Sequence, residues 1–196
     1  MVSEKIFVRI ILKCTVILII VAGLLRAEPF EKITLSLNGI LNTNQNKYHN
    51  YWEKARGIEF QCETPFYLGL AESGVQIAVN NAKSDNQPDY WSAFIFIGWG
   101  IDKNLTAGLS WYNGFRIGNY YMNFDDNDIY PTLKSESELG IEFKSSIRYS
   151  FKNNISLMLS GRYRTVYTGR RIYHSFISIG IGKTFSTPRW LKEFLD

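Results

Sequence analysis

An alternation of apolar and polar residues with a period of two constrains this chain most, and it runs through most of the sequence after residue 32. Successive side chains of a β-strand point to opposite faces, so this period indicates strands. The clearest run covers residues 139–151, where apolar residues occupy every odd position except Ser145. Similar runs begin near residues 33, 58, 68, 91, 105, 155 and 176. The sequence therefore predicts an all-β fold with eight strands.

The connections between these strands alternate in length. Short connections are predicted at 64–66, 102–104 and 152–154, whereas 44–56 and 116–137 are long and polar. Within the third strand the apolar positions switch parity at Ser73-Gly74, which predicts a β-bulge. Short turns on one rim and long loops on the other are typical of transmembrane barrels. We therefore predict an eight-stranded antiparallel up-and-down transmembrane β-barrel with both ends of the chain on the short-turn rim.

Two features indicate that the apolar face of this barrel points outward, although a soluble barrel with an apolar interior would show the same period. The polar face is rich in Gly and Ser, which suit the narrow lumen of eight strands. Aromatic residues gather at both ends of the apolar stripes, as in the girdles of membrane barrels. They are Phe66, Tyr67, Trp99, Phe151 and Phe185 near the short turns, and Tyr90, Trp91, Tyr163 and Tyr167 toward the long loops.

The N-terminal segment predicts export. Three basic residues precede an apolar run at residues 14–25, which is shorter than the roughly 20 residues of a membrane-spanning helix. We expect residues 1–27 to be a signal peptide, 28–185 the barrel, and 186–196 an amphipathic periplasmic tail with a short helix. Removal of residues 1–27 lowers the formal net charge from +4 to +1, so the basic pI predicts no nucleic-acid partner. The mature chain keeps only Cys62 and can form no internal disulfide.

The predicted inward face carries charged residues of both signs, which can pair across the lumen. This predicted lumen network consists of Glu59, Gln61, Glu63, Glu142, Lys144, Arg148, Arg162 and Arg164. Phe94, Phe96 and Phe176 also point inward in this register and narrow the lumen further. We therefore expect a polar, largely plugged lumen, and no wide aqueous pore.

With these features the chain resembles the small outer-membrane β-barrels of double-membraned bacteria, such as the OmpA-type transmembrane domain. Their C-terminal assembly signal is matched by Ser178, Gly180 and Phe185, whereas Lys183 departs from it. The resemblance implies location in the cell outer membrane, contact with its lipid and lipopolysaccharide, insertion by the barrel assembly machinery, and a monomeric state. It favours a structural role, or surface interactions made by the loops.

Two alternative functions come from related barrels. OmpW-type barrels, which the chain also resembles, imply a narrow channel or a binding site for small hydrophobic molecules. Lipid A deacylases use a His and a Ser two residues apart, whereas His174 and Ser175 are adjacent and would point to opposite faces of a strand. We therefore predict no catalytic residues and no enzymatic activity.

Few other residues suggest a ligand. Arg170 and Arg171, in the last long loop, are candidates for contact with lipopolysaccharide phosphates. Asp125, Asp126 and Asp128 lack the glycine and the distal glutamate of a calcium loop. No metal site and no cofactor are predicted.

Overall fold

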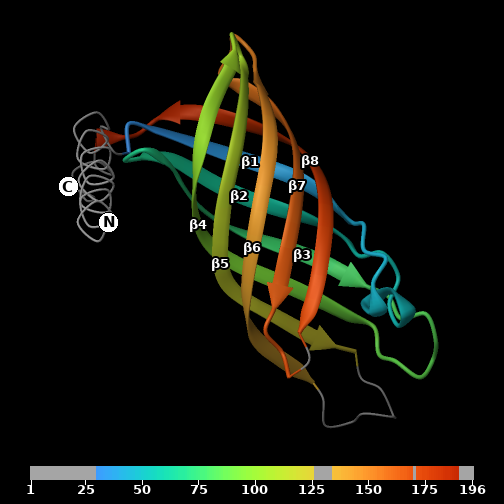
Figure 1. Cartoon of the computed structure of the whole chain (residues 1–196). Helices are drawn as coiled ribbons and strands as arrows, with labels where there is room; N and C mark the ends of the chain where they lie inside the picture. Colours follow the sequence, from blue (N-terminus) through green and yellow to red (C-terminus); the bar gives the residue numbers. More distant parts are fainter. Residues whose placement is uncertain (1–29, 126–133, 170, 190–196) are drawn as a thin grey trace, which may run out of the picture.

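The chain folds into a closed barrel of eight antiparallel strands, each paired with its neighbours along the chain (Figure 1). The structure is a computed structural model, and it describes residues 30–125, 134–169 and 171–189. The strands are β1 (Lys32–Asn42), β2 (Arg56–Phe66), β3 (Gly69–Asn80), β4 (Tyr90–Thr106), β5 (Leu109–Phe124), β6 (Ser135–Ser150), β7 (Ile155–Val166) and β8 (Ile172–Ser186). A short 3-10 helix, η1 (Lys47–Asn50), lies between β1 and β2. The predicted all-β, eight-stranded antiparallel fold is confirmed.

The connections follow the predicted alternation, but several lie elsewhere in the sequence. β2 continues through Phe66, so its turn is at Tyr67-Leu68, and β4 continues to Thr106, so the turn predicted at 102–104 lies at Ala107-Gly108. Gly108 has a φ of 84°, a left-handed conformation that glycine adopts without steric cost. The connection predicted at 116–137 is much shorter, because β5 extends to Phe124 and β6 begins at Ser135.

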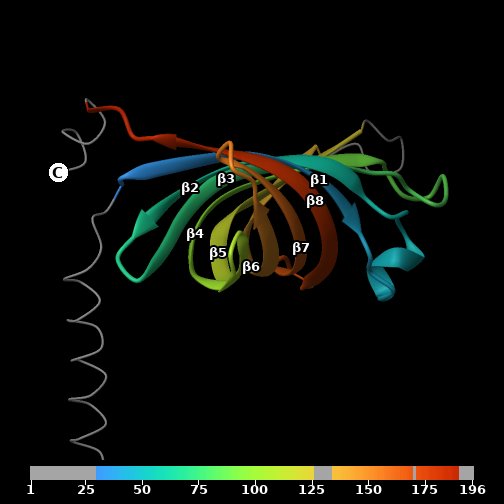
Figure 2. The ribbon, with the colours of Figure 1, turned by 90° about the horizontal axis from the view of Figure 1, so that it is seen from above.

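Both ends of the described chain lie at the short-turn rim. Figure 2 shows the start of β1 and the end of β8 on one side of the barrel and η1 on the other. The predicted signal peptide at 1–27 and residues 190–196 of the predicted tail lie outside the described residues. None of the described residues belongs to a helix long and apolar enough to cross a membrane.

Strand pairing determines which side chains share a face. β2 and β3 pair without interruption from Arg56 and Val79 to Phe66 and Gly69. The β-bulge predicted at Ser73-Gly74 is therefore wrong. Leu70 and Glu72 are both at even positions, and Glu72 faces inward, so the change in the apolar pattern needs no extra residue in β3. Among the described pairings, the one register shift is between Asn104 and Thr106, beside the β4–β5 turn.

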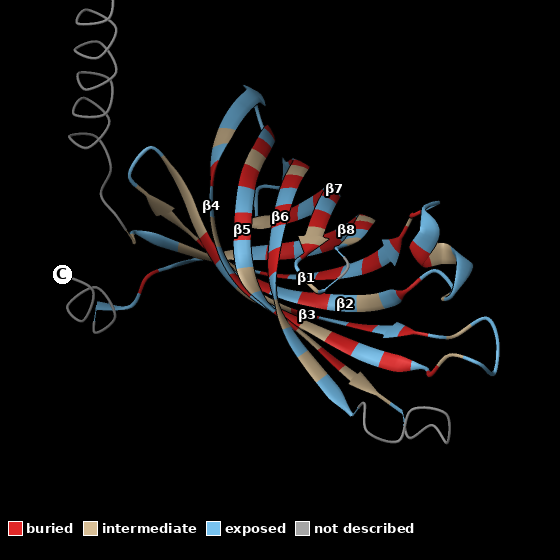
Figure 3. Cartoon of the chain, turned by 60° about the horizontal axis from the view of Figure 1, so that its bottom comes forward, coloured by how far each residue is buried: buried red, intermediate tan, exposed pale blue. Residues whose placement is uncertain are grey.

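The outer face of the barrel is apolar and the inner face is packed. Buried and exposed residues alternate along the strands (Figure 3). Ile97 and Phe115 on the outer face are each 65% exposed, whereas Phe94 and Phe96 face inward at 0% and 2%. The outer face also exposes most of the predicted girdle, with Trp99 and Phe185 toward the short turns and Trp91 and Tyr163 toward the long loops. The predicted place of Tyr90 in the girdle is wrong, because Tyr90 is 3% exposed and points into the barrel.

Candidate functional site: the barrel interior

The middle of the barrel holds a buried cluster of charged and amide side chains. All eight residues of the predicted lumen network are buried, the most accessible being Arg148 at 9%. The structure adds Glu72, Gln76 and Arg116 to them, all at most 4% exposed. We call these eleven residues the ionic cluster: Glu59, Gln61, Glu63, Glu72, Gln76, Arg116, Glu142, Lys144, Arg148, Arg162 and Arg164.

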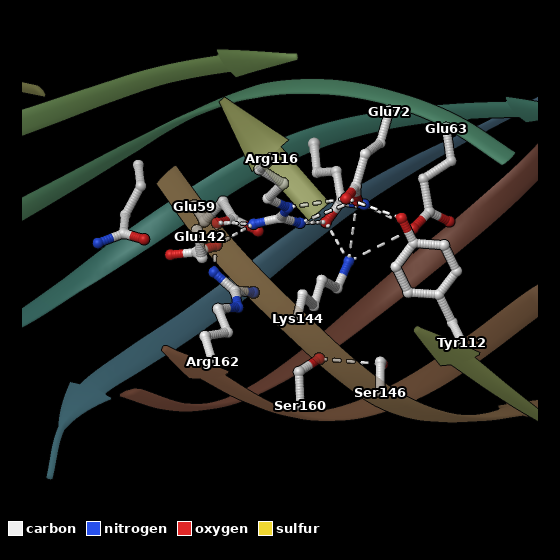
Figure 4. Close-up of polar contacts among 12 residues, drawn as sticks. Glu59, Glu63, Glu72, Tyr112, Arg116, Glu142, Lys144, Ser146, Ser160 and Arg162 are labelled. Carbon is white, nitrogen blue, oxygen red and sulfur yellow. Dashed lines mark hydrogen bonds and ion pairs between the residues drawn. The ribbon is translucent and has the colours of Figure 1, made fainter. Parts of the chain in front are cut away.

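Arg116 is the centre of this cluster (Figure 4). Its Nε and Nη2 donate to the two oxygens of Glu72 at 2.9 and 3.0 Å. Its Nη1 donates to Glu59 at 3.0 Å and to Glu142 at 2.9 Å, and Nη2 also reaches Gln61 at 2.9 Å. One guanidinium group thus contacts three carboxylates on three strands, and all of its N–H donors point at acceptors.

The other cations surround this centre. Lys144 Nζ lies 3.2 Å from Glu72 and 3.5 Å from Glu63, and Arg148 pairs with Glu63. Arg162 pairs with Glu59. Arg164 donates from Nε to Glu142 at 2.9 Å and from Nη2 to Gln76 at 2.6 Å.

Each carboxylate therefore pairs with at least one cation other than Arg116. The four carboxylates face five cations in a region closed to solvent. Among the described residues, buried guanidinium nitrogens of Arg148, Arg162 and Arg164 have no hydrogen-bond partner, so the ion pairs offset only part of the cost of removing these charges from water.

Aromatic rings cover the ionic cluster on the side of the long loops. The Arg164 guanidinium carbon lies 3.9 Å from the ring centre of Phe94, and that of Arg116 lies 4.1 Å from the ring centre of Phe96. The two rings stack on one another with 5.4 Å between their centres. They belong to a buried cluster with Tyr48, Tyr90, Tyr120, Met122 and Val166.

A cavity of about 760 Å³ opens above these rings, among the long loops. We call it the mouth pocket. Tyr48 from η1 forms part of its base, where its hydroxyl lies 2.8 Å from Asn80 Oδ1 and 2.6 Å from the Tyr90 hydroxyl. Burial raises the pKa of Tyr48 well above its ordinary value, so this group stays neutral and keeps its hydrogen bonds.

His174 lies in β8, 1% exposed, beneath Tyr48. Its Nδ1 is 3.4 Å from Asn42 Nδ2, and its ring stacks on Phe176. Ser175 has the opposite parity on the same strand, and its backbone N–H donates to Asn44. The structure does not bring the two side chains together.

The candidate lipopolysaccharide contacts are only partly described. Arg171 is exposed at the long-loop rim, with its guanidinium carbon 5.4 Å from the ring centre of Tyr167. Arg170 lies outside the described residues. Within the described ranges, no group of three or more His, Cys, Asp or Glu residues could hold a metal ion.

Comparison with known proteins identifies the fold. No protein-family model and no curated protein sequence matches this chain. Among solved structures, Neisserial surface protein A matches with a TM-score of 0.52 and 12% identity, covering 79% of this chain and 96% of that one. The chain resembles small outer-membrane β-barrels.

Two further structures agree with that resemblance. The N-terminal β-barrel domain of Pseudomonas aeruginosa OprF matches with a TM-score of 0.53 and 9% identity, over 81% of this chain and all of that one. The attachment invasion locus protein Ail of Yersinia pestis, solved with the heparin analogue sucrose octasulfate, matches with a TM-score of 0.51 and 12% identity over the same shares. At these identities the comparisons show the fold and leave the function to the residues of this chain.

The prediction from sequence missed Arg116 and Glu72 as interior residues. The sequence pattern places Arg116 at the edge of a predicted loop and Glu72 beside the predicted β-bulge. The signal for Arg116 was present in the alternation Gly114, Arg116, Gly118, Tyr120, which continues the inward face of β5.

Proposed function

We propose that this chain is an integral outer-membrane β-barrel with a plugged lumen, which acts structurally or through surface interactions of its long loops. The observation that carries the proposal is the apolar outer face. Ile95, Ile97, Ile179 and Phe115 are each at least 60% exposed, and they belong to a continuous set that surrounds the closed barrel. A soluble monomer rarely exposes a patch of this size, whereas a lipid bilayer covers it.

The buried interior supports the plugged lumen. Water or ions crossing the barrel would have to displace Arg116, Glu142 and Arg164, which are each at most 1% exposed and bonded to one another. We therefore propose that the resting barrel does not conduct, and we rank the channel alternative below the structural role.

The long loops supply the surface for partners. We propose that the exposed Arg171 contacts lipopolysaccharide phosphates, because guanidinium groups bind phosphate oxygens with two donors. Ail, which has a similar fold, was solved in complex with the heparin analogue sucrose octasulfate, and this is consistent with the proposal. We further propose export through a signal peptide, insertion by the barrel assembly machinery, and a monomeric barrel.

An acyl hydrolase is less well supported. Ser175 is not within reach of the His174 ring, whose neighbours are Asn42, Tyr48, Tyr120 and Phe176. A nucleophile needs its base within hydrogen-bonding distance and needs access to the substrate, and His174 is 1% exposed. We propose that His174 packs the base of the mouth pocket and has no catalytic role.

The test of the proposal is the behaviour of the mature protein in outer membranes. We expect it to fractionate with them and to run faster on a gel before boiling than after, because a closed barrel resists unfolding by detergent. Identical mobility in both samples, or recovery in the soluble fraction, would contradict it.

Planar-bilayer recording tests the plugged lumen separately. We expect no steady conductance from the wild type. Steady single-channel currents would refute the plug and favour the channel alternative, while leaving the membrane location intact.

A further inference from the structure

The mouth pocket has the size and walls of a binding site for a small molecule. Its volume of about 760 Å³ lies within the range of about 300–1,000 Å³ that is usual for ligand sites. Six aromatic side chains line it, together with Met122 and Ile172. The aromatic ones are Tyr48, Tyr51, Trp52, Tyr90, Phe124 and Tyr173.

The pocket is closed at its base. Tyr48, Tyr90 and Met122 line it and also belong to the buried cluster that contains Phe94 and Phe96. Below those two rings come Arg164 and Arg116 of the ionic cluster. A molecule that enters from the long-loop side therefore meets a base of packed rings and can bind there without a path onward.

Hydrogen bonds hold the walls in place before any ligand arrives. Trp52 Nε1 donates to the carbonyl of Pro88 at 3.0 Å, and the Tyr48 hydroxyl is bonded to Asn80 and Tyr90. Trp52 also stacks on Tyr48 with 5.1 Å between ring centres. These polar atoms are bonded within the protein, so the rings present mainly their carbon atoms to the pocket. A rigid wall of this kind lowers the entropic cost of binding.

The charges of the pocket are distributed unevenly. Lys47 and Arg171 both line it, and their segments touch, because Asn46 Nδ2 donates to the Tyr173 carbonyl at 2.9 Å. The carboxylate of Glu136 comes from β6, two strands away from β8. The side of the pocket where the β1–β2 and β7–β8 connections meet is therefore cationic.

We propose that the mouth pocket binds a small aromatic anion, with its rings against the aromatic walls and its anionic group toward Lys47 and Arg171. This goes beyond the membrane role proposed above, because it assigns a soluble ligand class to the barrel. Aromatic rings prefer offset or edge-to-face contact with other rings, and a carboxylate gains charge-assisted hydrogen bonds from lysine and arginine.

The test uses 2-naphthoate as the probe, with the folded mature barrel in non-ionic detergent at neutral pH and empty micelles as the blank. Isothermal titration calorimetry should show one saturable site with a Kd of about 1 mM or tighter. Saturated decahydro-2-naphthoate, of the same charge and similar shape, should bind more weakly. Absence of saturable binding, or equal binding of the saturated acid, would overturn the proposal.

Matched charge variants locate the site. The double variant K47Q/R171Q should weaken 2-naphthoate binding about tenfold and leave binding of neutral 2-naphthol nearly unchanged. K54Q/R56Q removes the same charge from exposed residues outside the pocket lining and should bind like the wild type. Equal loss in both variants would place binding elsewhere and overturn the assignment. Heat-modifiable gel mobility of each variant separates loss of the site from loss of the fold.

Discussion

Replacing Arg116 by Met should destabilise the barrel more than any other single change in the ionic cluster. The substitution removes five hydrogen bonds to Glu72, Glu59, Glu142 and Gln61. It also leaves Glu59, Glu72 and Glu142 with one cation each in place of two, and puts an apolar side chain of similar length among their carboxylates. Removing one partner of a buried ion pair costs about 3–5 kcal/mol, and Arg116 serves three carboxylates, so we expect the upper end of that range.

The double variant R116M/E72M provides the matched comparison. After both changes Glu59 still has Arg162, Glu63 still has Lys144 and Arg148, and Glu142 still has Arg164. The double variant removes one charge of each sign and so keeps the net charge of the cluster, which R116M changes. The Tyr112 hydroxyl, 2.8 Å from Glu72 Oε1, loses its acceptor, which costs about 1–3 kcal/mol. The double variant should therefore recover a large part of the stability lost in R116M.

The assay is reversible urea unfolding of the mature barrel in phosphatidylcholine vesicles, followed by tryptophan fluorescence and by gel mobility. R148M is a second control, because Arg148 lies at the edge of the cluster and, among the described residues, forms an ion pair with Glu63 alone. A loss below about 1 kcal/mol in R116M, or a double variant no more stable than R116M, would refute the reasoning that Arg116 stabilises the buried carboxylates it contacts.

Three further perturbations test other parts of the structure. I179R places a charge on the outer face, midway between the exposed aromatics Tyr173 and Phe185. It should lower the free energy of unfolding in vesicles by about 2–4 kcal/mol, whereas Y173R near the loop rim should lower it by about 0–1 kcal/mol. Equal costs would contradict the assigned depth. G140A brings a methyl group to 2.7 Å from Phe94 Cε2 and should lower the free energy of unfolding by about 1–3 kcal/mol. G161A, whose methyl group would meet nothing within 4 Å, should be neutral. A neutral G140A would mean that the rings can shift. Burial raises the pKa of Tyr48, so the stability that Tyr48 contributes is complete below the pKa of an unfolded tyrosine, about 10, and falls as pH rises above that value. Y48F should therefore lose less stability than the wild type at alkaline pH. An identical dependence of stability on pH would argue that Tyr48 is accessible to solvent.

The local sequence pattern was enough to predict the strands and their faces, because successive side chains of a strand point to opposite faces. Glu142, Lys144 and Arg148 alternate with Phe143 and Ile147 in the sequence, and they alternate between buried and exposed in the structure. The same reasoning failed where one alternation passes through a turn. Leu105, Ala107, Leu109 and Trp111 keep the same parity across the β4–β5 connection, so the turn at Ala107-Gly108 leaves no break in the pattern.

The organisation of the interior could not be predicted in the same way. Arg116 contacts Glu59, which is 57 residues away in the sequence, and Gln61, 55 residues away. Such contacts depend on barrel closure and on the register of every intervening strand, which no single segment encodes. Tyr90 illustrates the same limit, because an aromatic at a strand end suits a girdle as well as the hydrogen bond to Tyr48 that it makes.

The most direct test of the central claim is depth-dependent quenching of a fluorophore on the outer face. I179C in a mature C62S background would carry the label, since Ile179 is 60% exposed on the outer surface. In vesicles whose lipids are brominated near the middle of the acyl chain, the account predicts strong quenching by the lipid and little quenching by aqueous iodide. Strong quenching by iodide with no effect of the brominated lipid would contradict the claim that the apolar face of this barrel contacts acyl chains.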